Sequence, residues 1–484
     1  MKPRHIHLIG ICGTAMASLA GMLKQRGFLI TGSDVAAYPP MSDLLAGIGI
    51  RVSQPFAEAN LSPRPDLVVI GNALSRGNVE VEYVLDRRLP FTSMAALVHK
   101  EFLRGREVLT VAGTHGKTTT TSMLAWIFHV AGRQPSFLIG GIAENFGSSF
   151  AVTEGREFIL EGDEYDTAFF DKGPKFMHYF PDGVILTSVE FDHADIYRGL
   201  DEIKTAFKRL VNLVPRRGRV VAWDEQGSAG GLDQRSVAGS VSECVSRAFC
   251  TVERYGFAED STWRIREVRY QPHRTTWRVE RHGQPWAEFD FTLAGEYNVL
   301  NATAAAALAA GYGIASATIG DALSSFRSVK RRLEVKAEID GITVFDDFAH
   351  HPTAIAATLR ALRTRFAGCR LWAILEPRSN TLRRNVFQQE LVESLANADE
   401  VVMASVYFKP SDALGPEERL DVDAVVAELG RRGRRARQFA DADAIVAGIA
   451  SELRGGDVVA ILSNGGFGGI YEKLPARLRQ LQSR

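Results

Sequence analysis

Short apolar runs alternate along this chain with segments in which apolar residues recur at helical spacing. The runs predict strands buried on both faces, and the spaced segments predict helices that cover the sheets. Two further runs, 276–280 and 287–291, alternate apolar and charged residues around a His-Gly-Gln turn and predict a β-hairpin. We expect buried strands at residues 5–9, 29–32, 66–71, 108–112, 156–160, 184–188, 342–345, 370–375, 400–404 and 457–462.

The run at 108–112 leads into Gly113-Thr114-His115-Gly116-Lys117-Thr118-Thr119-Thr120, which a helical pattern follows. A glycine turn between strand and helix directs backbone N–H groups and the positive end of the helix at an anion such as a nucleotide phosphate. Lys117 would reach the outer phosphates, and the Thr118 hydroxyl would bind the Mg²⁺ that accompanies ATP. Only two residues separate the glycines, where the generic pattern has four, so the strand-turn-helix context carries this prediction.

The first predicted strand leads into Gly10-Ile11-Cys12-Gly13-Thr14-Ala15-Met16, and the second is followed by Asp34. Such glycines let a backbone approach a diphosphate, and the acidic residue can meet a ribose or a base. Met16 replaces the third glycine of the dinucleotide fingerprint, so NAD, a UDP-sugar or no ligand is compatible with this segment. Asn72 opens a polar loop after the strand at 66–71, where open α/β sheets bind ligands.

Acidic residues follow two strands of the middle region. Glu161, with Asp163 and Glu164 beyond it, is the first candidate for a Mg²⁺ ligand, although acidic residues after strands also cap helices. His193 lies in the motif 190–195 and is an unusual Mg²⁺ ligand, because this ion prefers oxygen. A softer second metal position or a water-mediated role would reconcile it.

Asn298 and Asn301 lie three residues apart on one predicted helical face, where amides can hydrogen-bond an adenine edge. Asn298 can alternatively cap that helix. The Ala-rich run 302–319, although interrupted by Gly311 and Gly313, predicts a packed helix and not a membrane span.

Three polar clusters directly follow strands of the last region, at 346–352, 376–381 and 463–469. We expect them on one rim of a second open sheet, because parallel strands end at the same edge. Their Arg, Asn, Ser and Gly content favours a carboxylate-bearing substrate, and Arg331-Arg332 could reach across to a phosphate.

These elements predict an α/β protein of three domains, because 484 residues exceed what one core accommodates. We expect a Rossmann-like N-terminal domain at 1–106, a central phosphate-loop ATPase domain with a mostly parallel sheet at 107–326, and a Rossmann-like C-terminal domain at 327–484.

Charge and cysteine content narrow the class of protein. Lys plus Arg and Asp plus Glu both number 57, which indicates neither a nucleic-acid partner nor a membrane partner. The four cysteines lack paired spacing, and no secretion signal is recognised at the start of the chain. We therefore expect a cytoplasmic enzyme with reduced thiols. A nicotinamide-dependent oxidoreductase and a nucleotide-switch protein remain alternatives from other classes.

The order of these motifs resembles that of the Mur ligase family over essentially the whole chain, and the shortened phosphate loop is typical of that family. The residues that carry the resemblance are 10–16, 113–120, 161–166, 192–193, Asn298 with Asn301, Arg331-Arg332 and 346–352. The family makes amide bonds in peptidoglycan synthesis with ATP. The resemblance implies that a substrate carboxylate is phosphorylated and that an amine then displaces phosphate.

Within the family, five segments resemble the ligases that attach the recycled tripeptide L-Ala-γ-D-Glu-meso-diaminopimelate to UDP-N-acetylmuramate. The alternative is the biosynthetic ligation of L-alanine to the same acceptor. Several relatives carry a carbamylated lysine where this chain has Phe207, followed by Lys208, so that role is not transferred. The five segments are 10–14, 38–41, 190–195, 376–381 and 463–469.

The resemblance also implies the roles of individual residues. Catalytic roles fall to Lys117, His193, Arg332 and His350. ATP would contact Gly113, Thr114, His115, Gly116, Lys117, Thr118, Thr119, Asn298, Asn301, Arg332 and Asp347. The UDP-sugar would contact Gly10, Cys12, Gly13, Thr14, Asp34 and Asn72. The peptide would contact Arg378, Ser379, Asn380, Ser463 and Asn464. Mg²⁺ would be held by Thr118, Glu161 and His193.

Overall fold

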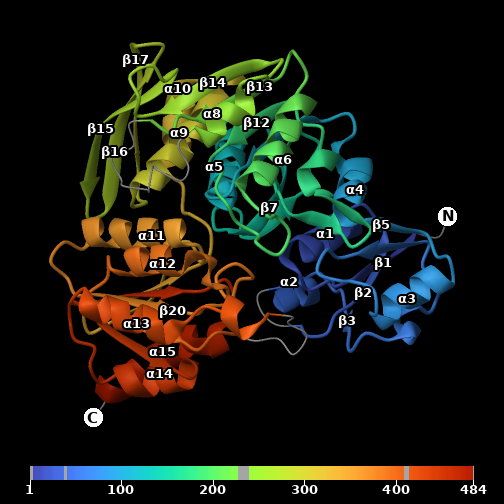
Figure 1. The fold of residues 1–484 in the computed structure, drawn as a ribbon. Helices are drawn as coiled ribbons and strands as arrows, with labels where there is room; N and C mark the ends of the chain where they lie inside the picture. The colour runs from blue at the N-terminus through green and yellow to red at the C-terminus, as the bar shows by residue number, and fades with distance from the viewer. Residues whose placement is uncertain (1–3, 38–40, 227–238, 408–413, 483–484) are drawn as a thin grey trace.

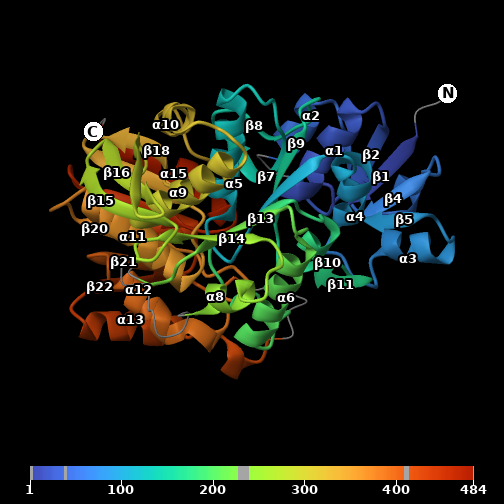
Figure 2. The same cartoon turned by 90° about the horizontal axis from the view of Figure 1, so that it is seen from above.

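A computed structural model describes residues 4–37, 41–226, 239–407 and 414–482, so Tyr38, Pro39 and Pro40 of the segment 38–41 lie outside it (Figure 1). Three α/β units follow one another along the chain, and the N- and C-terminal units lie on different sides of the central one (Figures 1 and 2). This architecture confirms the predicted fold class. In the described part of the chain, no helix combines the length and apolar character that crossing a membrane requires.

The N-terminal unit is built on a parallel sheet in the order β3-β2-β1-β4-β5. Both histidines of β1 are buried, and each ring lies 2.8 Å from the Thr31 hydroxyl on β2, so the strand accommodates them without breaking its apolar pattern. The strands are β1 (His5–Ile9), β2 (Leu29–Ser33), β3 (Val52–Ser53), β4 (Leu67–Ile70) and β5 (Phe91–Ser93), and the helices are α1 (Thr14–Gln25), α2 (Met41–Gly47), α3 (Val79–Asp86) and α4 (Met94–Val98).

The central sheet has the order β17-β16-β15-β14-β13-β12-β6-β9-β7-β8. Strands from β14 to β7 are parallel, whereas β15, β16 and β17 form an antiparallel ribbon and β8 is an antiparallel edge. The strands are β6 (Glu107–Ala112), β7 (Ser136–Ala143), β8 (Ser148–Ala151), β9 (Glu157–Gly162), β12 (Gly183–Leu186), β13 (Arg219–Trp223), β14 (Thr251–Gly256), β15 (Trp263–Gln271), β16 (Arg274–Arg281) and β17 (Gln284–Phe291). A separate hairpin pairs β10 (Asp166–Ala168) with β11 (Asp171–Pro174).

The helices of the central unit are α5 (Lys117–Val130), α6 (Leu200–Leu213), α8 (Ser240–Val245), α9 (Glu296–Gly311) and α10 (Ser316–Ser324). The single helix predicted over 302–319 is wrong. Gly313 has a φ of +81°, which no right-handed helix tolerates, so the Ala-rich run ends as α9 and α10 starts separately.

The C-terminal sheet has the order β18-β19-β23-β20-β21-β22, with β18 antiparallel to β19 and the remaining pairs parallel. The strands are β18 (Glu334–Ile339), β19 (Ile342–Asp347), β20 (Leu371–Leu375), β21 (Glu400–Ala404), β22 (Arg435–Phe439) and β23 (Val458–Leu462). The helices are α11 (Pro352–Arg365), α12 (Gln388–Leu395), α13 (Val422–Arg431), α14 (Ala442–Ile449) and α15 (Ile470–Gln482).

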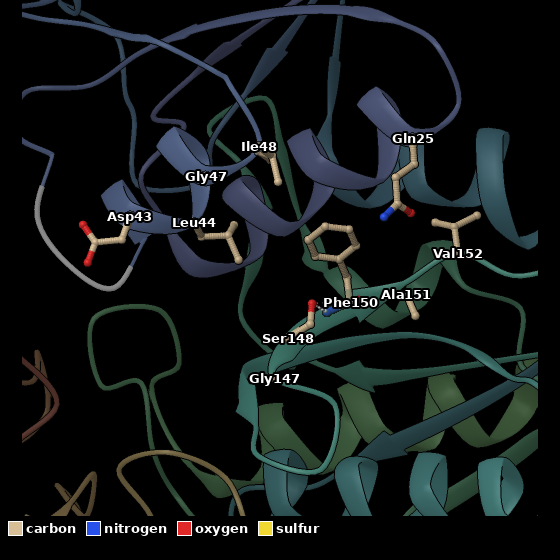
Figure 3. A pocket seen from close by; sticks show the side chains of 10 residues that line it. All are labelled: Gln25, Asp43, Leu44, Gly47, Ile48, Gly147, Ser148, Phe150, Ala151 and Val152. Atoms are coloured by element: carbon tan, nitrogen blue, oxygen red, sulfur yellow. Dashed lines mark hydrogen bonds between the residues drawn. The ribbon is translucent and has the colours of Figure 1, made fainter.

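The N-terminal and central units meet where α1 packs on β8. A Cβ atom at Gly21 would overlap the Phe150 ring, and the Ser18 and Ser149 hydroxyls lie 2.8 Å apart. A pocket of about 490 Å³ opens beside this contact, and Figure 3 shows the Phe150 ring beneath α1 and α2. Its lining includes none of the predicted site residues, so this pocket belongs to the domain junction.

Candidate active site

The phosphate loop is clamped from two sides. Gly113 and Gly116 have φ values of +135° and +80°, and a Cβ atom on Gly116 would lie 2.5 Å from the Asn301 Oδ1 atom of α9. On the other side, the Thr114 N–H donates to Ser188 O at 2.9 Å and the His115 N–H donates to Ser188 Oγ at 3.0 Å. These two N–H groups therefore bind the loop after β12, and the N–H groups of the first turn of α5 are the ones oriented for an anion.

Lys117 lies across the mouth of this loop. Its Nζ atom donates to Gly113 O at 2.7 Å and to the Glu164 carboxylate at 2.8 Å. Burial alone would lower the pKa of Lys117, but Glu164 and Asp163 raise it above the ordinary value. Lys117 is therefore a cation at neutral pH, next to the loop that would hold the phosphates.

Glu161 is the penultimate residue of β9 and faces the start of α5. Its carboxylate accepts a hydrogen bond from the Thr118 hydroxyl at 3.1 Å and another from the Gly140 N–H. Burial and the nearby Asp163 raise the pKa of Glu161 to about 7. The negative charge of Glu161 is therefore not balanced by its neighbours. A bound cation would favour the ionised form of this carboxyl.

His193 and Glu164 lie next to this pair. The His193 Nε2 atom is 3.2 Å from Glu164 Oε1, an atom that is buried and lacks a hydrogen-bond partner among the described residues. Burial would lower the pKa of His193, but Glu164 raises it. The Thr118 hydroxyl and the Glu161 carboxylate lie 3.1 Å apart, and oxygen donors of these kinds suit Mg²⁺. The His193 ring contacts Glu164, Asp192 and Tyr165, and these contacts do not join it to Thr118 or Glu161.

The two adjacent arginines of the C-terminal unit have different neighbours. Arg331 is held within that unit, since it pairs with Asp346 at 3.2 Å and donates to Ser463 O, Gly465 O and the Tyr471 hydroxyl. The Arg332 guanidinium instead lies 3.4 Å from the Thr118 hydroxyl. Of the pair, Arg332 alone contacts the phosphate loop.

His350 and Asp347 follow β19. The His350 Nδ1 atom lies 2.8 Å from Phe348 O, and burial lowers the pKa of His350 to about 4, so the ring is neutral at neutral pH. The buried Asp347 carboxylate accepts from the Leu333 N–H at 2.8 Å and the Ala349 N–H at 2.9 Å. Asp347 thus has a structural role in this loop, whether or not it also meets a ribose.

The side chains of Asn298 and Asn301, the two amides predicted to meet adenine, make different contacts. Asn298 does not cap α9, because Gly295 holds the capping position and the Asn298 amide donates to Ala294 O at 2.8 Å. Asn301 lies against Gly116 of the phosphate loop. Only Asn301 therefore contacts the loop directly.

The predicted UDP-sugar residues gather at the carboxyl edge of the N-terminal sheet. The Cys12 N–H donates to the Asp34 carboxylate at 2.8 Å, and Gly10 has a φ of +78° and faces Leu74 of the loop that contains Asn72. Gly13 caps α1, which begins at Thr14, and the Asn72 side chain is exposed. The glycine turn, the acidic residue and the polar loop are thus neighbours.

The predicted peptide residues divide into two groups. Arg378 stacks on the Tyr407 ring at 4.0 Å and lies against Gly465, and Asn464 Oδ1 is buried without a hydrogen-bond partner among the described residues. Ser463 donates to Glu376 at 2.5 Å beside them. Ser379 caps the turn at Leu382, and Asn380 instead reaches Asp195 of the central unit at 2.7 Å.

Sequence reasoning named the segment 190–195 but missed how it joins the domains. Thr353 donates to Glu190 at 2.6 Å, and Thr381 donates to Asp192 at 2.7 Å. The available signal was the position of these carboxylates in the loop that follows β12, at the same edge of the sheet as Glu161 near the end of β9. Lys208 instead forms an exposed ion pair with Glu243 at 2.5 Å.

Comparisons with known proteins give a consistent assignment. Residues 5–104 match the Mur ligase family catalytic domain, 111–309 the Mur ligase middle domain and 331–465 the glutamate ligase domain of Mur ligases. The chain is 42% identical to the UDP-N-acetylmuramate–L-alanyl-γ-D-glutamyl-meso-2,6-diaminoheptandioate ligase of Escherichia coli, over 97% of each chain. It is 32% identical to a UDP-N-acetylmuramate–L-alanine ligase of Geotalea daltonii, over 99% of each.

Among solved structures, a murein peptide ligase of Psychrobacter arcticus is similar, with a TM-score of 0.74, 35% identity and coverage of 98% of both chains. These comparisons do not support an oxidoreductase or a nucleotide switch. Identity above 30% over nearly the whole chain, with three consecutive domain matches, shows that this protein belongs to the Mur ligase family.

Proposed function

We propose that this protein uses ATP to join the tripeptide L-Ala-γ-D-Glu-meso-diaminopimelate to UDP-N-acetylmuramate, in the recycling of peptidoglycan in the cytoplasm. The observation that carries the proposal is the 42% identity, over 97% of both chains, to the Escherichia coli ligase named for these substrates. The relative named for L-alanine is less similar, at 32% identity.

The reaction proceeds through an acyl phosphate, because an unactivated carboxylate is a poor acyl donor. The lactoyl carboxylate attacks the γ-phosphorus of ATP and ADP leaves. The tripeptide amine then attacks the acyl carbon, phosphate leaves and the nitrogen loses a proton. Catalysis is mostly positioning and charge neutralisation.

Lys117 and Arg332 supply the positive charge near the phosphates, since both contact the phosphate loop. The neutral His350 keeps Nε2 as an acceptor, because Nδ1 is directed at Phe348 O. We assign to it a place beside the reacting carboxyl and phosphoryl groups, where its neutral ring can help to position them.

Mg²⁺ is expected with ATP, held by Thr118 and Glu161, with His193 as the third predicted ligand. A bound Mg²⁺ would neutralise charge on the transferred phosphoryl group. In its absence, Glu161 retains its raised pKa of about 7.

We assign residues 1–106 to UDP-sugar binding, 107–326 to ATP and 327–484 to the peptide. In the N-terminal unit, the turn at 10–14, Asp34 and Asn72 share one sheet edge, a suitable place for the diphosphate and nucleoside. In the C-terminal unit, Arg378, Ser463 and Asn464 form a polar rim that suits a carboxylate-bearing peptide.

The test is phosphate release from ATP in the presence of UDP-N-acetylmuramate, with the tripeptide and L-alanine added separately. Release with the tripeptide and not with L-alanine is expected. Release with L-alanine alone would replace this proposal by the biosynthetic first-step activity. Omission of UDP-N-acetylmuramate is the control, because an ATPase that ignores the acceptor would release phosphate in every tube.

A further inference from the structure

Three side chains with metal-binding groups meet where the central and C-terminal units join. His115 lies in the phosphate loop, Glu190 lies in the loop after β12, and His351 is the residue before α11. The His115 Nε2 atom lies 3.4 Å from Glu190 Oε2, and the His351 Nδ1 atom lies 4.0 Å from the same oxygen. One ligand atom from each residue falls within 4.8 Å of the other two.

These separations agree with a shared metal ion. Bonds of about 2.0–2.2 Å at tetrahedral angles place two ligand atoms roughly 3.3–3.5 Å apart. The His115–Glu190 distance of 3.4 Å already has that value, and the His351–Glu190 distance of 4.0 Å needs only a small rotation of a side chain. The third pair, His115 and His351, has ligand atoms within 4.8 Å of each other and must also close on the ion.

The surroundings orient both imidazoles. The His351 Nε2 atom lies 3.2 Å from Phe191 O, so its N–H donates there and Nδ1 keeps a lone pair on the side of Glu190. In metal sites, the ring nitrogen of a histidine that does not bind the metal commonly donates such a hydrogen bond, which orients the ring. The His115 Nε2 atom is buried and has no hydrogen-bond partner among the described residues, although it faces Glu190.

The competing interactions are few and specific. Thr353 donates its hydroxyl to Glu190 at 2.6 Å, and its N–H approaches His351 Nδ1 at 3.3 Å as the cap of α11. A metal ion would take over the Nδ1 lone pair, and the first of these two contacts could remain on the outer side of the carboxylate.

We propose that His115, Glu190 and His351 form a binding site for one divalent transition-metal ion of the Zn²⁺ class, separate from the Mg²⁺ position at Thr118 and Glu161. Two imidazoles and one carboxylate suit Zn²⁺, Co²⁺ or Ni²⁺, whereas Mg²⁺ favours an all-oxygen set. Because the ligands come from two units, the bound ion fastens the phosphate loop to the start of α11.

The probe is Co²⁺, whose visible absorption reports its ligand geometry, added to the full-length protein in the presence of excess Mg²⁺. The expected result is one Co²⁺ per chain with the intense bands of a four-coordinate site. The matched variant is His351→Asn, because an asparagine oxygen can still cap α11 while the imidazole is lost. These bands should disappear in His351→Asn and also in Glu190→Gln.

His193→Ala distinguishes the two metal positions, because it alters the predicted Mg²⁺ site and leaves the proposed site intact, so the bands should persist. Binding of a fluorescent ATP analogue by each variant checks that its central domain is folded. Absence of Co²⁺ bands in the wild type, their persistence in folded His351→Asn, or their loss in folded His193→Ala would each overturn the proposal.

Discussion

Arg331 and Arg332 are adjacent in sequence, yet their contacts predict different defects. Arg331→Met removes a partly buried guanidinium and leaves Asp346 without its ion pair. We expect a loss of about 3 kcal/mol in the free energy of unfolding, measured by urea denaturation. Arg332→Met should cost less stability, because Arg332 forms no ion pair with a described residue, and should reduce kcat roughly 10²–10³-fold. Equal loss of stability in both variants would contradict this division.

Lys117 is predicted to act on phosphate and not on the UDP-sugar. Lys117→Met should abolish measurable phosphate release, because the cation next to the phosphate loop is lost, a change worth at least roughly 10²–10³-fold. UDP-N-acetylmuramate binding, measured by calorimetry, should stay within about twofold. Lys172→Met is the control, since Lys172 forms an exposed pair with Asp166 on the same domain. If Lys117→Met lost UDP-N-acetylmuramate binding together with phosphate release, Lys117 would have a structural role instead.

Glu161 makes stability depend on pH. Its pKa is raised from 4.5 to about 7 by burial and Asp163, so the folded state holds the proton more tightly than the unfolded state. Without Mg²⁺, the contribution of Glu161 is most favourable below pH 4.5 and falls as pH rises through 7, by roughly 3 kcal/mol in total.

Thermal unfolding across this pH range, with and without Mg²⁺, measures the effect. Mg²⁺ should stabilise the protein more at pH 8 than at pH 5, because the ion competes with the proton for the carboxylate. Glu161→Gln should remove most of this pH dependence. The same pH dependence in Glu161→Gln would assign it to another group.

At the scale of the elements, the conformation of the phosphate loop requires glycine at position 116. A side chain there meets a φ of +80° and the Asn301 amide at 2.5 Å. Gly116→Ala should therefore weaken ATP binding by roughly tenfold or more, since such backbone strain costs about 1–3 kcal/mol. Gly132→Ala is the control: it also has positive φ, but nothing lies within 4 Å of its added Cβ atom. Calorimetric titration with an ATP analogue compares the two, and equal affinities would show that the contact with Asn301 is unimportant.

Buried parallel strands were the elements best predicted from sequence, because both faces require apolar residues and the runs are therefore continuous. The strands at 5–9 and 400–404 have the predicted bounds. The strand β15 was missed because its exposed half carries charged residues, such as Arg266 and Glu267, without clear alternation. The break between α9 and α10 was missed because both glycines were interpreted as tolerated within one helix.

At the scale of the whole molecule, the sequence predicted which loops contain the site residues. It did not predict which of these loops face each other. Thr118 and Arg332 are separated by more than two hundred residues, and their contact depends on how the third unit docks on the second. Periodicity contains no signal for docking. The family resemblance assigned the phosphate role to Arg332 and not to Arg331, but the ion pair of Arg331 with Asp346 and the contact of Asn380 with Asp195 were beyond sequence reasoning.

The docking of the C-terminal unit itself yields the last prediction. Thr381 donates to Asp192 at 2.7 Å, a buried hydrogen bond between units, and a closed arrangement keeps water away from an acyl phosphate. Thr381→Val preserves shape and removes one of two donors to Asp192 Oδ1, which still accepts from the His193 N–H at 2.7 Å. The closed arrangement should then lose about 1–3 kcal/mol.

The ligand-free variant should have a larger radius of gyration by X-ray scattering, because its open population rises, and kcat should fall while ATP binding is retained. Thr364→Val is the matched control, since that hydroxyl is exposed on α11 and bonds only its own helix, to Arg360 O. A radius of gyration unchanged in Thr381→Val but with reduced kcat would mean that this hydrogen bond orients the loop at 190–195 without governing closure.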